Sequence, residues 1–359
     1  MTAPLRVLVV DDSAYNRRNI ADILGGNDEV EVVGKAADGE EALRLALQLK
    51  PDVITLDLEM PRMDGFTFLR ILMARQPTPV IVVSSYSQKE NVFKALELGA
   101  IDFVAKPEQR YSFDGPIRRE ILQKVRLIRS LRPLTYRPLP ASTAAVTAPA
   151  VRGADATLRA PQPQLRYLIA IASSTGGPSA VLELISRIPE RFTGSLLIAQ
   201  HMPDKFTKTF AERLDKKGNI RVAEAMDNDA VAARRALVCP GRNCMEVMVG
   251  AGGGIGLQAD LRIRLSAPSK ADRYVPSADR LFRSVAEVAG SRAVGIILTG
   301  MGDDGTKGAR HIIDAGGMVI AESEETAVVY GMPGAAVRAG VVTDIQSLGG
   351  IADYLTTLV

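Results

Sequence analysis

Apolar runs of strand length alternate with helix-like stretches along most of this 359-residue chain. In the first 130 residues the pattern predicts strands at 5–10, 30–36, 53–56, 80–83 and 101–105. The predicted helices are 14–24, 40–49, 66–74, 91–98 and 117–130. Because each helix must carry the chain back across the sheet before the next strand, this succession predicts a doubly wound parallel sheet.

A change of composition separates this region from a second alternating region. Residues 131–165 are rich in proline and alanine, and such a segment buries too little apolar surface to order itself. We therefore predict a domain at 1–130, a linker at 131–165 and a second domain at 166–359. The second domain shows predicted strands at 167–172, 195–199, 294–299 and 318–321, and predicted helices at 180–187, 205–214, 279–289, 307–314 and 332–339.

The predicted fold class is α/β, with two doubly wound parallel-sheet domains. The first is flavodoxin-like and the second Rossmann-like. Short apolar runs and glycine-rich turns at 221–265 predict antiparallel strands inserted into the second domain.

Composition excludes several classes of protein. Hydrophobic residues make up 47% and charged residues 24% of the chain, as in soluble globular proteins. No apolar run approaches the roughly 20 residues that span a bilayer, and no signal peptide is visible. We therefore expect a cytoplasmic protein without membrane insertion. The net charge of +3 comes with no basic cluster, which argues against a nucleic-acid partner. Two cysteines are too few for a disulfide framework or a cysteine-rich zinc site.

Polar residues stand where four of the first five predicted strands end: Asp11 and Asp12, Asp57, Ser84 and Lys106. The carboxyl ends of parallel strands meet at one edge of a sheet, so these side chains should converge. Three crowded carboxylates repel one another unless a hard cation joins them, and oxygen ligands suit Mg²⁺. One aspartate could then accept a phosphoryl group, with the lysine and a hydroxyl holding its oxygens. Taken singly, these residues could be helix caps or surface charges.

The strand at 167–172 ends in the run Ser-Ser-Thr-Gly-Gly-Pro. Small residues, Ala172 and Gly176, stand two positions before and after Ser174, an arrangement similar to the strained G-x-S-x-G turn that exposes a nucleophilic serine. The same positions around Ser173 hold bulkier side chains, so Ser174 is the better candidate nucleophile. An ordinary strand-to-helix turn is the alternative. A phosphate-binding loop is a second one, but its G-x-x-x-x-G-K-[ST] pattern is absent.

A histidine and an aspartate pair follow two other strands of this domain. Serine acyl chemistry needs a base, a carboxylate that orients it, and N–H donors for the oxyanion. His201 follows the strand at 195–199 and is the only credible base, because His311 lies inside a predicted helix. Asp303 and Asp304 follow the strand at 294–299, although either could simply cap a helix. The chain order Ser, His, Asp differs from that of α/β-hydrolases.

The first domain resembles a response-regulator receiver domain over its whole length. The motifs that carry the resemblance are Val-Val-Asp-Asp-Ser, Asp-Val-Ile-Thr-Leu-Asp-Leu-Glu-Met-Pro-Arg-Met-Asp-Gly, Val-Val-Ser-Ser and Asp-Phe-Val-Ala-Lys-Pro. The resemblance implies that Asp57 accepts a phosphoryl group from a histidine kinase. It also implies a Mg²⁺ site at Asp11, Asp12 and Asp57, phosphate contacts from Ser84 and Lys106, and a switch role for Phe103.

The second domain resembles the chemotaxis protein-glutamate methylesterase (CheB) family, in which a receiver precedes the esterase domain. The matching segments are Ala-Ser-Ser-Thr-Gly-Gly-Pro, Gln-His-Met-Pro, Pro-Ser-Ala-Asp-Arg-Leu-Phe, Leu-Thr-Gly-Met-Gly-Asp-Asp-Gly and Tyr-Gly-Met-Pro. By these motifs Ser174 is the nucleophile, His201 the base and Asp304 the carboxylate. Thr175 and Met301 would help to place the imidazole and the oxyanion. One departure is a cysteine, Cys244, near where the family more often has a histidine.

The resemblance implies a phosphorylation-activated serine hydrolase. It would remove methyl esters from glutamate side chains of methyl-accepting chemoreceptors, and deamidate receptor glutamines, without a cofactor in the esterase domain. The alternative is a response regulator whose C-terminal module binds a ligand or protein without catalysis. That alternative gives no reason for His201 and Asp304 to stand at the ends of other strands.

Overall fold

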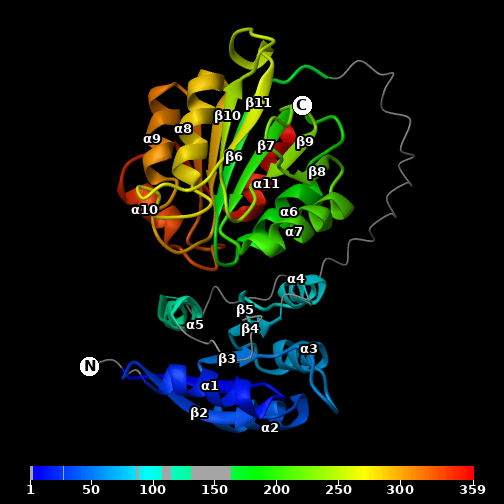
Figure 1. Cartoon of the computed structure of the whole chain (residues 1–359), viewed down its shortest axis with the longest axis vertical. Helices are drawn as coiled ribbons and strands as arrows, with labels where there is room; N and C mark the ends of the chain where they lie inside the picture. The colour runs from blue at the N-terminus through cyan, green and yellow to red at the C-terminus, as the bar shows by residue number, and fades with distance from the viewer. Residues whose placement is uncertain (1–2, 27, 86–88, 107–114, 131–162) are drawn as a thin grey trace.

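The computed structural model describes residues 3–26, 28–85, 89–106, 115–130 and 163–359. Figure 1 shows two α/β units, an N-terminal unit (residues 3–130) and a C-terminal unit (163–359), one above the other. The predicted linker at 131–165 lies almost wholly outside the described residues. No described helix is both long enough and apolar enough to cross a membrane.

The strands of the N-terminal unit form one parallel sheet in the order β2-β1-β3-β4-β5. The strands are β1 (Leu5–Val10), β2 (Val30–Ala36), β3 (Val53–Leu56), β4 (Val80–Ser84) and β5 (Asp102–Ala105). The helices are α1 (Ala14–Gly25), α2 (Gly39–Leu49), α3 (Gly65–Arg75), α4 (Lys89–Glu97) and α5 (Pro116–Leu127), followed by the short η2 (Ile128–Ser130). This is the predicted doubly wound sheet, in which strand order reverses between β1 and β3.

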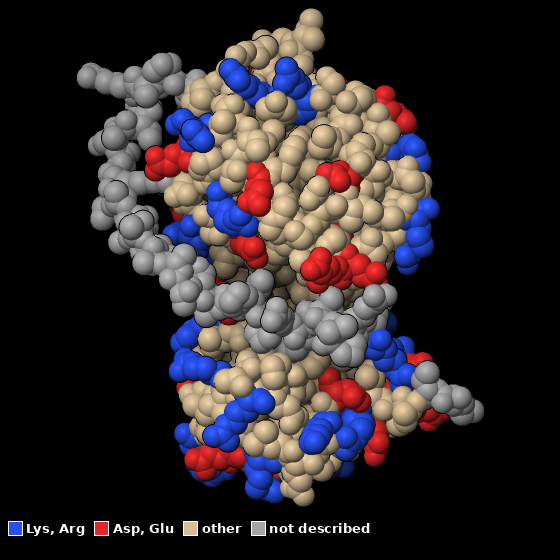
Figure 2. All heavy atoms as spheres, turned by 180° about the vertical axis from the view of Figure 1, so that it is seen from behind, with Lys and Arg blue, Asp and Glu red and all other residues tan. Residues whose placement is uncertain are grey.

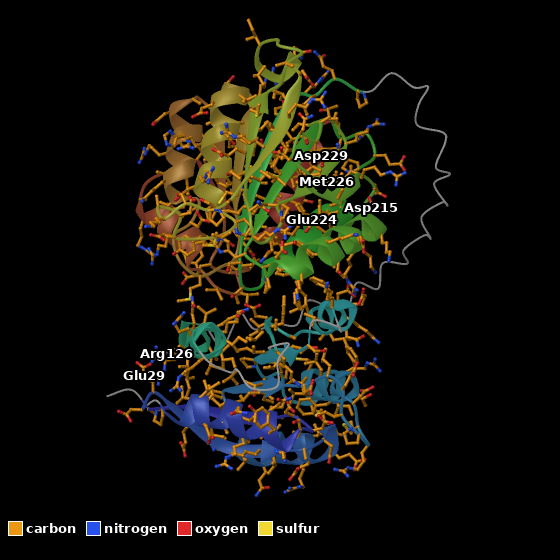
Figure 3. All side chains as sticks on the ribbon, viewed as in Figure 1. Glu29, Arg126, Asp215, Glu224, Met226 and Asp229 are labelled. Atoms are coloured by element: carbon orange, nitrogen blue, oxygen red, sulfur yellow. The ribbon has the colours of Figure 1, made fainter. Side chains whose placement is uncertain are left out.

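Helices cover both faces of this sheet, which explains its nearly unbroken apolar strands. Alternate residues of β1 point to opposite faces: Leu8 packs in the core beneath α2, α3 and α4, and Val9 packs in the core beneath α1 and α5. An ion pair joins α5 to the chain just before β2, which is an edge strand of the sheet. Arg126 Nε on α5 lies 2.7 Å from Glu29 Oε2 (Figure 3).

The main sheet of the C-terminal unit is also parallel, in the order β14-β13-β12-β6-β7-β9-β8. Its strands are β6 (Tyr167–Ser173), β7 (Gly194–Gln200), β8 (Arg221–Glu224), β9 (Arg235–Val238), β12 (Ala293–Ile297), β13 (Met318–Glu322) and β14 (Asp344–Gln346). The helices are α6 (Gly177–Arg187), α7 (Asp204–Lys217), α8 (Ala278–Ala289), α9 (Thr306–Asp314), α10 (Met332–Arg338) and α11 (Leu348–Thr357). Short 3₁₀ turns occur at η4 (Gly256–Gln258) and η5 (Gly290–Arg292).

This sheet is the middle layer of three. Ile169 and Ile171 of β6 pack in the core beneath α6, α7 and α11, whereas Leu168 and Ala170 pack in the core beneath α8, α9 and α10. Figure 1 shows these two helical layers on opposite sides of the strands. His311 lies within α9, as predicted, and its side chain is exposed to solvent.

The prediction for residues 221–265 was partly wrong. The antiparallel insertion exists, but it consists of β10 (Cys244–Val249) paired with β11 (Leu261–Ser266). By contrast, β8 and β9 extend the main sheet: β9 pairs parallel with β7, and β8 pairs parallel with β9 at the edge. Short apolar runs do not encode strand direction, and β9 gains burial on both faces only by joining the parallel sheet. The terminal pair β14 and α11 had no counterpart in the predictions.

The two units bury aromatic side chains against each other. Phe103 of β5 packs on Phe206 of α7, with ring centroids 4.6 Å apart, and Phe93 of α4 stacks on Phe210 of α7 at 5.6 Å. At the rim, Arg213 Nη2 lies 2.5 Å from Glu97 Oε2. Away from the junction, basic and acidic side chains are interspersed on the face shown in Figure 2. The contact between the units therefore combines an apolar centre with a charged rim.

Candidate active site

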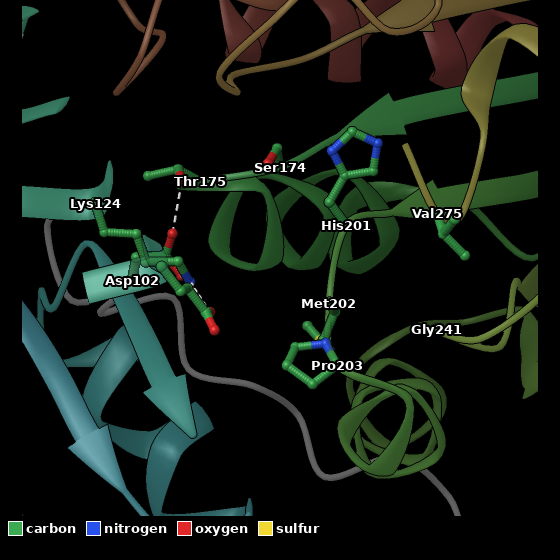
Figure 4. A pocket seen from close by; sticks show the side chains of 10 residues that line it. Asp102, Lys124, Ser174, Thr175, His201, Met202, Pro203, Gly241 and Val275 are labelled. Atoms are coloured by element: carbon green, nitrogen blue, oxygen red, sulfur yellow. Dashed lines mark hydrogen bonds and ion pairs between the residues drawn. The ribbon is translucent and has the colours of Figure 1, made fainter. Parts of the chain in front are cut away.

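The sheet of the C-terminal unit brings the predicted serine, histidine and aspartate to one edge. Ser174 follows β6, His201 follows β7 and Asp304 follows β12, which are neighbours in the sheet centre. Ser174 and His201 line one cavity of about 300 Å³ (Figure 4). No hydrogen bond joins their side chains within the described residues.

The two adjacent serines have different surroundings. Ser173 is fully buried at the end of β6, and its hydroxyl donates a 2.6 Å hydrogen bond to Gln200 Oε1. Ser174 is half-buried and faces the cavity. A hydroxyl that faces a cavity can meet a substrate, whereas the Ser173 hydroxyl is enclosed. The geometry therefore supports the choice of Ser174 made from its small neighbours.

His201 is held by Asp304. His201 Nε2 lies 2.8 Å from Asp304 Oδ2, and the aspartate is only 1% exposed. The same carboxylate accepts the N–H groups of Ala278 at 2.8 Å and Asp279 at 3.1 Å, in the first turn of α8. Asp304 thus caps a helix and orients the histidine at the same time, since the helix N-terminus fixes a negative group. With Nε2 on the aspartate, Nδ1 is the ring nitrogen left to act as a base.

Gln200 and Thr299, which the sequence patterns did not single out, hold the segments that follow β6 and β7 in place by hydrogen bonds. Gln200 Nε2 donates to the carbonyl oxygens of Ser174 at 2.9 Å and His201 at 3.0 Å. Thr299 accepts the Ser174 N–H through its carbonyl at 3.1 Å, and its hydroxyl donates to the Thr175 carbonyl at 2.9 Å. Gln200 adjoins His201 in the Gln-His-Met-Pro motif, and Thr299 lies in the Leu-Thr-Gly-Met-Gly motif. Membership of these motifs could therefore have indicated that both residues support the site.

Met301 lies in the loop that packs against Ser174. A Cβ at Gly300 would lie 2.7 Å from Ser174 Cβ, so glycine allows this loop to approach the serine. Among the described residues, the Met301 N–H has no hydrogen-bond partner within the protein. The Met301 side chain is 38% exposed. An unpaired N–H in the loop that packs against the serine is suited to stabilising an oxyanion.

In the N-terminal unit the predicted acidic residues also converge. Carboxylate oxygens of Asp11, Asp12 and Asp57 lie within 4.8 Å of one another. Lys106 Nζ lies 2.6 Å from Asp57 Oδ2 and 2.9 Å from Asp11 Oδ2. Ser84 is fully buried at the end of β4 and pairs through its carbonyl with the Lys106 N–H. An oxygen-only cluster of this kind fits a hard divalent cation.

Burial dominates the electrostatics of this cluster. Desolvation raises the pKa of Asp57 to about 6, although the Lys106 ammonium acts in the opposite direction. Desolvation also raises the pKa of Asp11. Burial by itself would lower the pKa of Lys106, but Asp57 and Asp11 outweigh it and raise that pKa. The lysine thus remains a cation, able to neutralise charge on Asp57.

The N-terminal unit reaches into the serine site. Thr175 donates a 2.6 Å hydrogen bond from Oγ1 to Asp102 Oδ2 of β5, which Figure 4 shows beside Ser174. Lys124 of α5 lies 3.0 Å from the other oxygen of Asp102 and lines the same cavity. Gln123 of α5 donates to Met301 Sδ at 3.2 Å. Both helper residues predicted around the serine, Thr175 and Met301, are therefore bound by the N-terminal unit.

Phe103 connects the two sites. It follows Asp102 directly in β5, is 3% exposed, and packs on Phe206 of the C-terminal unit. Lys106, which pairs with Asp57, lies three residues further along the chain. A short stretch at 102–106 thus contacts the phosphoacceptor candidate at one end and the serine loop at the other.

Comparison with known proteins places both units in families. The family described as CheB methylesterase matches residues 169–355, and the response regulator receiver domain matches residues 7–114. A protein-glutamate methylesterase/protein-glutamine glutaminase of Myxococcus xanthus is 47% identical over 99% of this chain and 97% of its own length. One from Anaeromyxobacter dehalogenans is 48% identical over 98% of this chain and 95% of its length.

A solved structure agrees with these matches. The CheB methylesterase catalytic domain of Thermotoga maritima superposes with a TM-score of 0.50 at 34% identity, covering 54% of this chain and 98% of that one. These matches favour an esterase over the non-catalytic binding module considered as the alternative. The chain belongs to the CheB methylesterase family, with a response regulator receiver domain ahead of its esterase domain.

Proposed function

We propose that this chain hydrolyses methyl esters of glutamate side chains on chemoreceptors, with Ser174, His201 and Asp304 as its catalytic residues. The observation that carries the assignment is the His201–Asp304 hydrogen bond of 2.8 Å at the edge of the cavity that holds Ser174. The ester carbonyl would enter this cavity between the Ser174 hydroxyl and the free N–H of Met301. The activity is tested by methanol release from a methylated chemoreceptor, with and without a phosphodonor.

The mechanism follows from these positions. Ser174 Oγ attacks the ester carbonyl while His201 Nδ1 takes its proton, and Asp304 stabilises the imidazolium that forms. The Met301 N–H donates to the oxyanion, and Thr175 helps to hold the loop. The imidazolium then gives its proton to the departing methoxide, which leaves as methanol. Water, activated by His201, hydrolyses the acyl-enzyme to glutamate and free serine.

The same site accounts for deamidation of receptor glutamines. The attack and the acyl-enzyme are identical, and ammonia leaves in place of methanol. The curated relatives are named for both activities. We assign the chain to chemotaxis adaptation in the cytoplasm, with methyl-accepting receptors as substrates and a histidine kinase as phosphodonor.

The receiver domain controls access to this site. In the present arrangement Asp102, Glu120 and Lys124 of the receiver line the same cavity as Ser174. A receptor helix could not reach the serine past them. The His201–Asp304 pair is in place at the cavity that Ser174 lines, so separation of the domains would suffice for activity.

Phosphorylation of Asp57 would favour that separation. Asp11, Asp12 and Asp57 would hold Mg²⁺, which supplies charge neutralisation for the phosphoryl group. Lys106 would contact a phosphate oxygen, and Ser84 would bind another. Because Lys106 and Phe103 share β5 and the loop after it, a shift at the phosphate would disturb the Phe103–Phe206 contact at the interface.

Asp102→Ala is expected to raise the esterase rate of the unphosphorylated full chain about 10- to 100-fold. The change removes a charge-assisted hydrogen bond to Thr175, and such a bond contributes about 1.5–3 kcal/mol. Glu120→Ala is the matched control, because Glu120 also pairs with Lys124 but has no hydrogen bond to Thr175. Methanol release without phosphodonor checks this. Equal basal rates for Asp102→Ala and wild type would contradict a role for this bond in holding the domains together.

A further inference from the structure

A tyrosine from outside the predicted motifs lies flat against the candidate base. Tyr274 belongs to the loop between β11 and α8, and its ring stacks on the His201 imidazole with centroids 5.3 Å apart and planes 7° apart. The next residue, Val275, lines the cavity beside His201 (Figure 4). The loop therefore forms the wall of the site on one face of the histidine.

The far end of Tyr274 is fixed by the aspartate loop. Its hydroxyl donates a 2.8 Å hydrogen bond to Asp303 Oδ1, and Arg273 also pairs with Asp303, at 3.3 Å. Burial and the bond to Asp303 raise the pKa of Tyr274, so the hydroxyl stays protonated as a donor. A Cβ at residue 302 would lie 2.3 Å from the tyrosine hydroxyl, so Gly302 leaves the room that this contact needs.

Two neighbouring carboxylates thus reach the same imidazole by different routes. Asp304 binds its edge at Nε2, and Asp303 holds the tyrosine that covers its face. A single hydrogen bond at one ring atom leaves the imidazole free to tilt about that contact. A parallel ring held in place removes this freedom, and it also offers an electron-rich face to the imidazolium that forms when the base takes a proton.

We propose that Tyr274 is a positioning residue that fixes the plane of the His201 imidazole for proton transfer from Ser174. The inference rests on the proposed role of His201 as the base. It assigns Asp303 the task of anchoring Tyr274, a role distinct from that of Asp304. The ring of Tyr274 is the part that acts on His201, and its hydroxyl secures that ring.

Kinetics of the phosphorylated full chain test the proposal. Tyr274→Leu keeps an apolar side chain but has no flat face, so kcat for methanol release should fall about 10- to 100-fold, because small misplacements of a catalytic group are costly. KM should stay within about twofold, since Tyr274 is not proposed to bind the receptor. Tyr274→Phe keeps the ring and should retain kcat within about threefold of wild type, losing only the Asp303 bond.

A spectroscopic measurement tests the stacking without relying on activity. The chain has two histidines, and His311 is exposed on α9, so it serves as an internal reference. The ring protons of His201, assigned with His201→Gln, should show an upfield ring-current shift in a histidine-labelled, untagged full chain. Tyr274→Leu should abolish the shift, and Tyr274→Phe should keep it.

Each outcome separates this inference from the proposed function. A normal kcat in Tyr274→Leu, a loss confined to KM, or a kcat of Tyr274→Phe as low as that of Tyr274→Leu would overturn the positioning role. The role would also be overturned if the His201 ring protons had the same chemical shifts in Tyr274→Leu as in wild type. If His201→Gln itself keeps full activity, the proposed catalytic assignment fails, whatever the tyrosine variants show.

Discussion

Ser174→Ala is expected to lower kcat for methyl ester hydrolysis by at least about 10³-fold, because it removes the proposed nucleophile and leaves only binding and oxyanion stabilisation. Ser173→Ala should keep kcat close to that of wild type. Ser173 is enclosed, and its hydroxyl is bound to Gln200. Its loss should instead lower the free energy of unfolding by about 1–3 kcal/mol, since the buried Gln200 Oε1 loses its hydrogen-bond donor while Gln200 Nε2 keeps its two carbonyl partners.

Methanol release by the two purified variants, with the phosphodonor present, measures the difference in kcat. Urea unfolding of each variant provides the control, because Ser174→Ala should unfold at the same midpoint as wild type. An active Ser174→Ala together with an inactive, stably folded Ser173→Ala would show that the wrong serine was assigned.

His201→Gln should reduce kcat as much as Ser174→Ala, and the double variant should be little worse than either single variant. Residues that act in one step lose their effect together, so their free-energy costs are not additive. Asp304→Asn should also cost about 10³- to 10⁴-fold, because an amide cannot stabilise the imidazolium. Asp303→Asn is the matched control and should be far milder, since Asp303 reaches His201 only through Tyr274.

The kcat values of all these variants are obtained from methanol release at saturating methylated receptor. If the losses in His201→Gln and Ser174→Ala multiply in the double variant, the two residues do not share one step. An Asp303→Asn variant as slow as Asp304→Asn would show that the assignment of the triad carboxylate is incomplete.

The sheet positions of the candidate residues could be predicted because parallel strands all end at one edge. Asp11 and Asp57 in the receiver, and Ser174 and His201 in the esterase domain, are all found at such ends. A strand followed by a helix fixes where its last residue lies, even when the neighbouring strands are unknown. The local sequence pattern was therefore enough to predict that the candidate residues of each domain lie close together.

Contacts that depend on distant segments could not be predicted in this way. The Thr175–Asp102 bond joins residues 73 positions apart and exists only because the two domains pack together. Tyr274 lies in a loop without secondary structure, whose path over His201 is set by the Asp303 bond. The direction of β9 was missed for a related reason, since its pairing with β7 is decided by burial in the assembled sheet.

The proposed control of the serine site by the receiver rests on the contacts of Asp102 and Gln123 with Thr175 and Met301. The most direct test compares methanol release by the full chain with that of a fragment that begins near Gln164, each with and without a phosphodonor. The unphosphorylated full chain should be slow and should accelerate on phosphorylation, whereas Asp57→Ala should stay at the basal rate. The fragment should be fast in both conditions. A fragment no faster than the unphosphorylated full chain would contradict inhibition by occlusion and would indicate that the receiver activates the esterase by direct contact.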